Sequence, residues 1–440
     1  MVRTEPARGM RDFLPEDVRR REYVVGIIKR VYERYGFEPL ETPAVENLDT
    51  LLGKYGDEGN QLIYKILKRG EHEASGQADL ALRYDLTVPL ARVIAHHQGK
   101  LPRLFKRYQI QPVWRADRPA RARFREFYQC DVDSLGSTSP VVEAEVCAAV
   151  SDALIELGFT DFTIRLNHRQ LLTSMLNALS VPEALHGSAL VAVDKLDKIG
   201  VDAVRAEMTG RGIAAEAAAG LLGMFDSVRA AGGAGVAALD AAGQAAMRNL
   251  AAILDLVAGT TAAERMTLDP SLARGLSYYT GAIMEINVAD LTGSMGGGGR
   301  YDNLIGMFLG QSVPACGFSL GLERILVVMG ERGMFPASLA VTPADVMVAV
   351  FDAADMPHAM RVAARLRQSG LRAFVYPDAD KIGKQIKYAD SRGIPFVALL
   401  GSDEIANGTV TVKRLAAKEQ STYDQAAAGA AILEDLNKRG

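Results

Sequence analysis

The sequence has few cysteines, few histidines and no long apolar run. Its three cysteines, Cys130, Cys147 and Cys316, are scattered without the spacing of a metal site, which is typical of the reducing cytoplasm. No stretch of about 18 apolar residues predicts a membrane span, and the charged residues up to Asp17 do not resemble a signal peptide. The six histidines are unclustered, and no Gly-Lys-Ser/Thr follows the glycine run 296–299, so this run is not a P-loop.

The chain is long enough for several domains, and its charges are nearly balanced. It has 440 residues, of which 48% are hydrophobic and 23% charged, and this composition is typical of a soluble globular protein. The length favours about three domains of ordinary size. The formal net charge is −3, so a nucleic-acid partner would have to bind local basic patches, because the whole chain is not basic.

A predicted hairpin in the first third of the chain carries most of the candidate chemistry. One strand leads into Arg115, a polar turn spans 116–122, and a second strand follows. Side chains alternate along a strand, so one face of the second strand is mostly apolar and holds Phe124, Glu126, Tyr128, Cys130 and Val132. The other face is polar apart from one ring and holds Arg123, Arg125, Phe127, Gln129, Asp131 and Asp133. Because arginine forks match phosphate oxygens, the polar face is a candidate ligand floor; an exposed hairpin with a solvated face is the alternative.

Periodicity predicts an alternation of helices and strands around this hairpin. Before residue 181, the predicted helices are 15–35, 85–97 and 140–157, and the predicted strands are 37–43, 64–67, 80–84 and 162–166. Between 181 and 263 the chain is rich in alanine, yet Leu221, Phe225 and Val228 keep helical spacing, so we expect a helical insertion and not disorder. Strand patterning returns at 268–279, 283–288, 293–301 and 316–320, before a helix at 321–330.

The last part of the chain predicts a separate domain. A linker rich in small residues and proline, 333–344, precedes a βαβ pattern. Its predicted strands are 346–351, 373–376 and 396–400, and its predicted helices are 358–368 and 382–391. This rhythm indicates an α/β domain of about one hundred residues.

Three further stretches carry residues suited to a charged ligand. Asp85-Leu86-Thr87 places a carboxylate and a hydroxyl at a strand end, where a helix cap is an equally simple reading. The segment 272–281, LARGLSYYTG, packs an arginine and two adjacent tyrosines into a glycine-bounded turn, although paired tyrosines are commonly core residues. The segment 314–324, PACGFSLGLER, runs into a helix that carries Arg324, which could equally be solvated.

Taken together and in this order, these stretches resemble the class II aminoacyl-tRNA synthetases, and within them the histidine–tRNA ligase family. The strand around Pro43 is similar to the first class motif, a dimer-interface element; the Arg115 hairpin to the second; and Gly321-Leu322-Glu323-Arg324 to the third. Segments similar to signatures of the histidine family are ARGMRDFLPED, LLGKYGDEG, VDKLDKIG, ARGLSYYTGAIMEI and GGGGRYDNLIGMF. One departure is Ser277, where the family commonly has Asp.

The resemblance implies a domain plan. It implies an α+β catalytic domain with an antiparallel sheet at 1–180 and 264–332, and a helical insertion domain at 181–263. It further implies a linker at 333–344 and an α/β anticodon-binding domain at 345–440.

The resemblance also implies an ATP site. Arg115 would contact the α-phosphate, Arg123 the outer phosphates, and Phe127 would stack on adenine, whose other face Arg324 would cover. Asp117 would contact adenine where the class often has Glu. Arg274 would stabilise transition-state charge, in a role that a metal ion plays in other class II enzymes. Magnesium should accompany the ATP phosphates, and we assign no protein metal ligand.

Histidine would be bound beside ATP. The implied histidine-binding residues are Asp85, Leu86, Thr87, Arg115, Gln129, Asp133, Arg274, Tyr278 and Tyr279. Asp85, Thr87 and Gln129 would read the α-ammonium. Asp133 and Tyr278 would read the ring, with Tyr279 alongside, because a carboxylate and a phenol on opposite ring nitrogens fix a tautomer. The glycines 296–299 would bring the backbone close to substrate, with tight packing as an equal alternative.

The implied partners are tRNA(His), L-histidine, ATP and a second copy of the chain in a cytoplasmic homodimer, without a membrane. Candidate phosphate contacts in the last domain are Lys381, Lys384, Lys387, Lys413 and Arg414, any of which could equally be solvated. The alternative function is that of the non-catalytic regulatory paralogue of ATP phosphoribosyltransferase, which shares the catalytic fold. That paralogue lacks the terminal domain and usually has degraded signatures, whereas Arg115, Gln129, Arg274 and Arg324 are all present here.

Overall fold

The chain forms two compact units, 1–335 and 336–440, which we describe separately. The computed structural model describes residues 4–70, 75–231, 236, 238–273, 278–339 and 342–438. Among these residues, every helix is too short or too polar to cross a lipid bilayer.

The first unit is built on an eight-stranded sheet with the order β1-β5-β6-β11-β10-β9-β7-β8. The inner six strands pair antiparallel, while β1 and β8 at the edges pair parallel with β5 and β7. The strands are β1 (Glu38–Pro39), β5 (Phe105–Trp114), β6 (Glu126–Leu135), β7 (Phe162–His168), β8 (Met266–Leu268), β9 (Ala282–Val288), β10 (Gly296–Arg300) and β11 (Ala315–Gly321). The predicted antiparallel α+β architecture is thus confirmed, with one parallel strand added at each edge.

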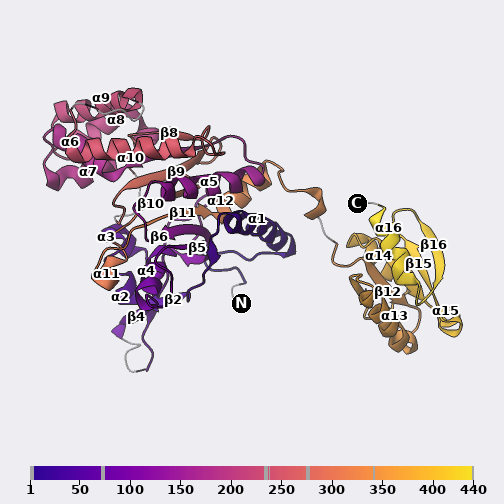
Figure 1. The fold of residues 1–440 in the computed structure, drawn as a ribbon. Coiled ribbons are helices and arrows are strands. Elements are labelled where there is room, and N and C mark those ends of the chain that lie inside the picture. The colour runs from indigo at the N-terminus through magenta and orange to yellow at the C-terminus, as the bar shows by residue number, and fades with distance from the viewer. Residues whose placement is uncertain are drawn as a thin grey trace. The chain divides into compact units, whose positions relative to one another are not determined.

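Three helices cover the apolar face of this sheet: α1 (Pro15–Arg34), α5 (Val141–Glu156) and α12 (Leu322–Glu331) (Figure 1). Helix α1 begins with Pro15 in its first turn beside two acidic residues, and the chain turns at Gly36 with φ 75°. Cys130 and Val132 of β6 are fully buried under these helices, as the predicted alternation requires. The polar face of β6 is therefore turned away from this core.

A smaller lobe packs around its own apolar cluster at the end of the β5–β6 hairpin opposite the turn. Its three-stranded sheet has the order β2-β4-β3, with β2 (Val45–Asn47), β3 (Lys65–Leu67) and β4 (Ala78–Leu82). Its helices are α2 (Leu48–Leu51), α3 (Gly56–Gln61), α4 (Thr87–His96) and α11 (Gly306–Leu309). Only Glu38–Pro39 of the predicted strand 37–43 is paired as β1, and Leu40 N just beyond it donates to Tyr108 O of β5 at 2.9 Å. The buried Arg83 donates to the carbonyls of Thr42 at 2.6 Å and Pro43 at 3.2 Å.

The alanine-rich segment is helical, as predicted. Its helices are α7 (Glu183–Val193), α8 (Leu196–Gly210), α9 (Ala215–Ala231) and α10 (Ala241–Val257). Helix α6 (Arg169–Ala178) precedes the segment. These helices gather beyond the β7–β8 edge of the sheet (Figure 1). Their buried residues, such as Phe225 and Leu250, belong to the same apolar cluster as Ile164 and Ile286 of the sheet. The insertion therefore shares a continuous core with the sheet.

The strand predicted over 268–279 was wrong in its described part. Strand β8 ends at Leu268, and Leu272 N donates to Asp269 O at 3.0 Å in a turn. Pro270 has no N–H for a ladder, and the Asp269 carboxylate accepts from Ser271 N at 3.0 Å instead. Residues 274–277 lie outside the described residues.

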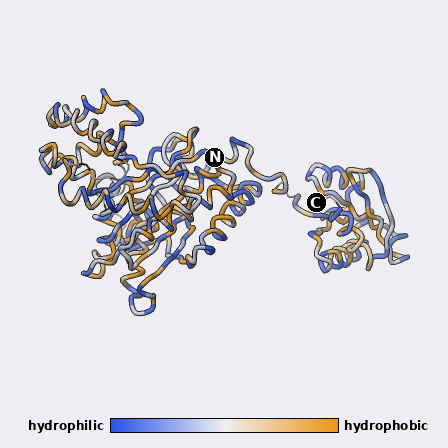
Figure 2. Tube along the Cα trace, turned by 45° about the horizontal axis from the view of Figure 1, so that its top comes forward, coloured by the Kyte–Doolittle hydropathy of each residue, from blue (hydrophilic) through white to orange (hydrophobic). Residues whose placement is uncertain are grey.

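The second unit is an α/β domain with a five-stranded sheet of order β13-β12-β14-β15-β16. The first three strands pair parallel, and the last two pair antiparallel. Its elements are β12 (Val346–Val350), α13 (Met356–Gln368), β13 (Ala373–Val375), α14 (Ile382–Ser391), β14 (Phe396–Leu400), α15 (Ser402–Asn407), β15 (Thr409–Arg414), β16 (Glu419–Asp424) and α16 (Ala428–Asn437). The predicted βαβ core is confirmed, whereas the sequence analysis did not predict β15, β16, α15 or α16. Strand β16 is largely hydrophilic (Figure 2).

Candidate active site

The polar face of β6 forms a buried floor and not a solvated surface. Gln129 is 8% exposed, and Asp131 and Asp133 are each 2% exposed. Residues two apart on a strand share a face, so these three side chains line one side of the sheet. The exposed-hairpin alternative is therefore wrong for these three positions, and their role as a ligand floor stays a prediction.

Asp85 lies deep in the site and joins several elements. Its Oδ1 accepts hydrogen bonds from Val88 N at 3.1 Å and Tyr55 OH at 3.0 Å, and its Oδ2 accepts from Tyr278 OH at 3.2 Å. Asp85 thus caps the start of α4, as the helix-cap reading expects, and also accepts a hydrogen bond from Tyr278. Its role toward a ligand stays a prediction. Burial raises the pKa of Asp85, and the Val88 N–H followed by the Arg115 charge opposes that rise. Leu86 is fully buried.

Arg115 leaves the end of β5 and lies between two aromatic rings. Its Nε donates to Tyr84 O at 3.0 Å, and its guanidinium carbon is 4.3 Å from the Tyr84 ring centre and 5.2 Å from that of Phe127. The register places Val113 opposite Phe127, which brings the arginine and the ring together. The structure therefore assembles the predicted Arg115 and Phe127 side by side.

Two other predicted ATP residues meet each other across the hairpin turn. Arg123 Nη2 lies 2.8 Å from Asp117 Oδ1, and Arg123 Nε donates to Asp117 Oδ2 at 3.2 Å. The Arg123 side chain is about half exposed, so this pair is worth little and can open for a ligand. Arg324, in the first turn of α12, donates to the Ser294 carbonyl.

The glycine strand β10 is explained mainly by close packing. A Cβ at Gly298 would lie 2.2 Å from Gly317 O on β11. A Cβ at Gly299 would lie 2.6 Å from Ala282 O and 2.9 Å from the Tyr279 ring. The packing alternative therefore accounts for Gly298 and Gly299, and the absence of a side chain at 299 leaves room for Tyr279.

The sequence analysis missed the residues that hold Asp133. The buried Arg107 on β5 places Nη2 2.8 Å from Asp133 Oδ2, and Tyr301 OH donates to Asp133 Oδ1. Burial raises the pKa of Asp133, and the Arg107 charge opposes that rise. Period-two alternation along β5 puts Arg107, Gln109 and Gln111 on one face, and this signal could have identified Arg107.

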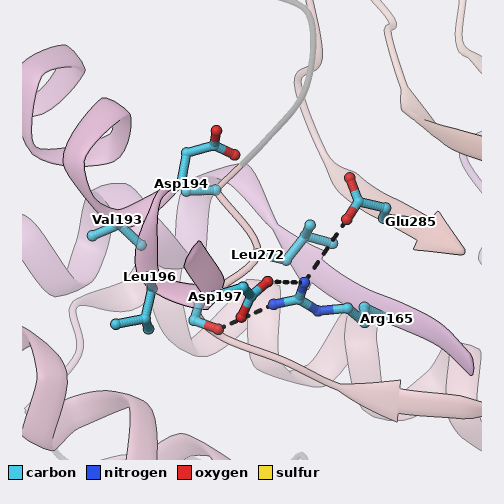
Figure 3. Close-up of a pocket in the computed structure, with 9 residues that line it drawn as sticks. Arg165, Val193, Asp194, Leu196, Asp197, Leu272 and Glu285 are labelled. Carbon is cyan, nitrogen blue, oxygen red and sulfur yellow. Dashed lines mark hydrogen bonds and ion pairs between the residues drawn. The ribbon is translucent and has the colours of Figure 1, made fainter. Parts of the chain in front are cut away.

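A second charged cluster lies where the insertion meets the sheet (Figure 3). Arg165 on β7 lies 2.6 Å from Asp197 of α8, 2.6 Å from Asp269 and 3.8 Å from Glu285 of β9. Ala273 lines the same small cavity. The predicted catalytic Arg274 follows it in the chain and, with Ser277, lies outside the described residues. Within the described ranges, no three His, Cys, Asp or Glu side chains are placed to hold a metal ion.

The antiparallel sheet, the arginine-bearing hairpin and the Gly-Leu-Glu-Arg helix start are those of a class II aminoacyl-tRNA synthetase. A family model described as histidyl-tRNA synthetase matches residues 9–325, and one described as an anticodon binding domain matches 345–435. The chain belongs to the histidyl-tRNA synthetase family, whose members use ATP to ligate histidine to tRNA.

Histidine–tRNA ligases from other organisms are similar in sequence to this chain over nearly its whole length. The histidine–tRNA ligase of Christiangramia forsetii is 40% identical over 95% of this chain and 96% of its own length. That of Gloeobacter violaceus is 40% identical over 97% of this chain and 98% of its own length. The crystal structure of histidyl-tRNA synthetase from Nostoc sp. PCC 7120 is 31% identical, with a TM-score of 0.79 over 99% of this chain and 100% of that chain.

Proposed function

We propose that this chain activates L-histidine with ATP on the polar face of β6 and transfers the histidyl group to tRNA(His). The buried Gln129 on β6, Arg115 held beside Phe127 of the same strand, and the hydrogen bond from Tyr278 to the buried Asp85 support this assignment. Histidine carries an ammonium, a carboxylate and a polar ring, and the floor offers carboxylates, an amide, phenols and an arginine for them.

In the first step the histidine carboxylate attacks the α-phosphorus of ATP in line, and pyrophosphate leaves. The carboxylate is already ionised, so the protein supplies position and charge neutralisation instead of a nucleophile. Arg115 would contact the α-phosphate and the substrate carboxylate, since it is held by Tyr84 O beside Phe127. Arg274 would stabilise the charge that develops on the α-phosphoryl oxygens.

The ATP part of the site would run from Arg115 to Phe127. Phe127 would stack on adenine with Arg324 on the other face, and Asp117 would contact the adenine edge. Arg123 would exchange its exposed pairing with Asp117 for the outer phosphates. Magnesium would enter with ATP and be held mainly by phosphate oxygens, because the described residues offer no cluster of three or more carboxylate, imidazole or thiol side chains for it.

The histidine part would lie deeper. Asp85, Thr87 and Gln129 would bind the α-ammonium at the start of α4, with Leu86 forming the wall between them. Tyr278 and Asp133 would contact the ring, and Tyr279 would flank it, since the two tyrosine ring centres are 5.1 Å apart. Buried polar groups left unpaired by an analogue would supply discrimination of many-fold.

In the second step, a ribose hydroxyl of the tRNA's terminal adenosine would attack the carbonyl carbon of histidyl-adenylate, form the ester bond and release AMP. We assign 1–180 and 264–332 to catalysis, 181–263 to an insertion domain, 333–344 to a linker and 345–440 to anticodon binding. Lys381, Lys387 and Lys413 are phosphate-contact candidates, and Lys384 and Arg414 would first leave their pairs with Asp380 at 2.7 Å and Asp435 at 3.4 Å. A cytoplasmic homodimer is the assembly expected for this function.

Histidine-dependent exchange of pyrophosphate into ATP tests the proposal directly. We expect exchange with histidine and none with other amino acids, and a loss of most of the rate in Arg274→Ala with histidine still bound. Absence of exchange, under conditions where ATP binds, would support the regulatory paralogue instead. The terminal α/β domain, which that paralogue lacks, argues against it.

A further inference from the structure

Three buried acceptor atoms on β6 have no hydrogen-bond donor among the described residues: Gln129 Oε1, Asp131 Oδ1 and Asp133 Oδ2. Asp133 Oδ2 lies 2.8 Å from the Arg107 cation, which leaves Asp131 Oδ1 and Gln129 Oε1, on side chains 2% and 8% exposed, as the two without a charged partner. The two residues are neighbours on one face of the strand, so the two oxygens belong to one site. Buried acceptors are almost always paired, and an unpaired one costs about 1–3 kcal/mol, so such a pair marks a place where a donor arrives from outside.

Among the described residues, the Ser319 hydroxyl, opposite Asp131 on β11, hydrogen-bonds the Asp131 carboxylate, and Asp131 Oδ1 stays without a donor. The other neighbouring donors are engaged elsewhere. Opposite Asp131 on β5, Gln109 Nε2 donates to Thr42 Oγ1 at 2.9 Å and to Gln111 Oε1 at 2.6 Å. Arg107 Nη1 donates to Gln109 Oε1 at 3.2 Å, and its Nη2 lies 2.8 Å from Asp133 but 3.8 Å from Asp131 Oδ2. On β6 itself, Gln129 Nε2 donates to Ser319 Oγ at 2.8 Å.

Negative charge exceeds positive charge in this part of the site, and Asp131 is the carboxylate that lies farther from the cation. Among the described residues, Arg107 is the one fully buried cation beside two carboxylates, Asp131 and Asp133, and it approaches Asp133 more closely. Asp133 has the Arg107 charge beside Oδ2 and a hydrogen bond from Tyr301 at Oδ1. Burial raises the pKa of both aspartates, and the nearby charge of Asp85 adds to that rise. A ligand that presents N–H groups and positive charge matches this excess.

We propose that Asp131 is a specificity-determining residue that accepts a hydrogen bond from an imidazole N–H of the substrate histidine. This assignment rests on the proposed function and adds a residue to the ring-binding side of the site. Gln129 Oε1, the neighbouring free acceptor, faces the α-ammonium in the same complex. Asp133 then serves chiefly to anchor Arg107 and Tyr301 beneath the ring, and contacts the ring through a remaining lone pair.

The experiment is pyrophosphate exchange with Asp131→Ala and Asp131→Asn, using histidine as substrate and thiazolylalanine, whose ring has no N–H, as competitive inhibitor. A hydrogen bond to a charged group contributes about 1.5–3 kcal/mol, so KM for histidine should rise roughly 10- to 100-fold in Asp131→Ala. Asp131→Asn keeps a neutral acceptor and should recover part of this loss. KM for ATP and the inhibition constant of thiazolylalanine should change less than about threefold in both variants, because neither depends on a ring N–H.

Two outcomes overturn the assignment. If KM for histidine stays within about threefold of wild type while thermal stability changes, Asp131 is only a structural partner of Arg107. If histidine and thiazolylalanine bind the Asp131 variants with an equal loss of affinity, Asp131 shapes the pocket but accepts no hydrogen bond from the ring N–H. Failure of the wild-type chain to exchange with histidine is a different result, because it removes the proposed function itself.

Discussion

Arg107 Nη2 lies 2.8 Å from Asp133 Oδ2 in the interior of the sheet, where the arginine is fully buried and the aspartate is 2% exposed. The two residues are direct cross-strand neighbours of β5 and β6. The pair fixes the floor of the proposed histidine site, because Asp133 is also the partner of Tyr301.

We expect Arg107→Met to destabilise the first unit strongly. Removing one partner of a buried ion pair leaves an uncompensated charge and costs about 3–5 kcal/mol of unfolding free energy. Urea unfolding at neutral pH measures the loss. Arg30→Met is the matched control, since Arg30 is 62% exposed in its pair with Glu156 and should cost no more than about 1 kcal/mol. Equal losses in the two variants would show that the buried pair has no special role.

Gly317 provides the space in which the Asp133 carboxylate lies. A Cβ at Gly317 would be 1.8 Å from Asp133 Oδ1, whereas one at Gly297 in the neighbouring strand meets only Met284 O at 3.4 Å. Gly317→Ala should therefore displace Asp133 and raise KM for histidine about tenfold or more, while Gly297→Ala should change it less than about threefold. KM for ATP is the internal reference, and a similar KM for histidine in both variants would contradict this role of Gly317.

The polar floor was predictable because it depends on a local property, the period of two along a single strand. Gln129, Asp131 and Asp133 share a face whatever the strand pairs with. The partners of Asp133 were not predictable in the same way. Arg107 reaches it through the β5–β6 register, and Tyr301 reaches it from a segment well over a hundred residues away in sequence.

Other parts of the fold escaped prediction for identifiable physical reasons. Strand β16 reads EQSTYD and is exposed along most of its length, so it has no apolar alternation to mark it. The strand expected over 268–279 failed because Pro270 and the Asp269 side chain favour a turn. The amphipathic helices α1 and α12, by contrast, bury one face each and were recognised at nearly their observed bounds.

Glu323 should make stability depend on pH. It is 2% exposed, and burial raises its pKa from 4.5 to about 7, although Oε2 accepts from Tyr128 N at 2.9 Å. Because the folded state then binds more protons between about pH 4.5 and 7, its contribution to stability is present below pH 4.5 and is lost as pH rises through 7.

Glu323→Gln removes this titration and keeps an acceptor for Tyr128 N. We therefore expect the variant to gain stability relative to wild type between pH 5 and pH 8, by up to about 3 kcal/mol. Urea unfolding of both proteins at the two pH values gives the difference, in which contributions from all other groups cancel. Parallel pH profiles for the two proteins would mean that Glu323 titrates near its ordinary value in the folded state.

The two steps of the reaction should separate when the second unit is removed. Each unit has its own apolar clusters, so a chain that ends at Pro336 keeps the whole core around the site. Such a chain should retain most histidine-dependent pyrophosphate exchange and lose most tRNA charging, because the anticodon contacts are gone.

A chain that ends at Gly333 is the control for a truncation that removes part of the first unit. It also lacks Phe335, whose ring centre is 6.5 Å from that of Tyr23 and 5.0 Å from the Arg20 guanidinium, and should be less stable than the first truncation. If the chain ending at Pro336 lost exchange and charging to the same extent, the second unit would be needed for activation itself and not only for tRNA binding.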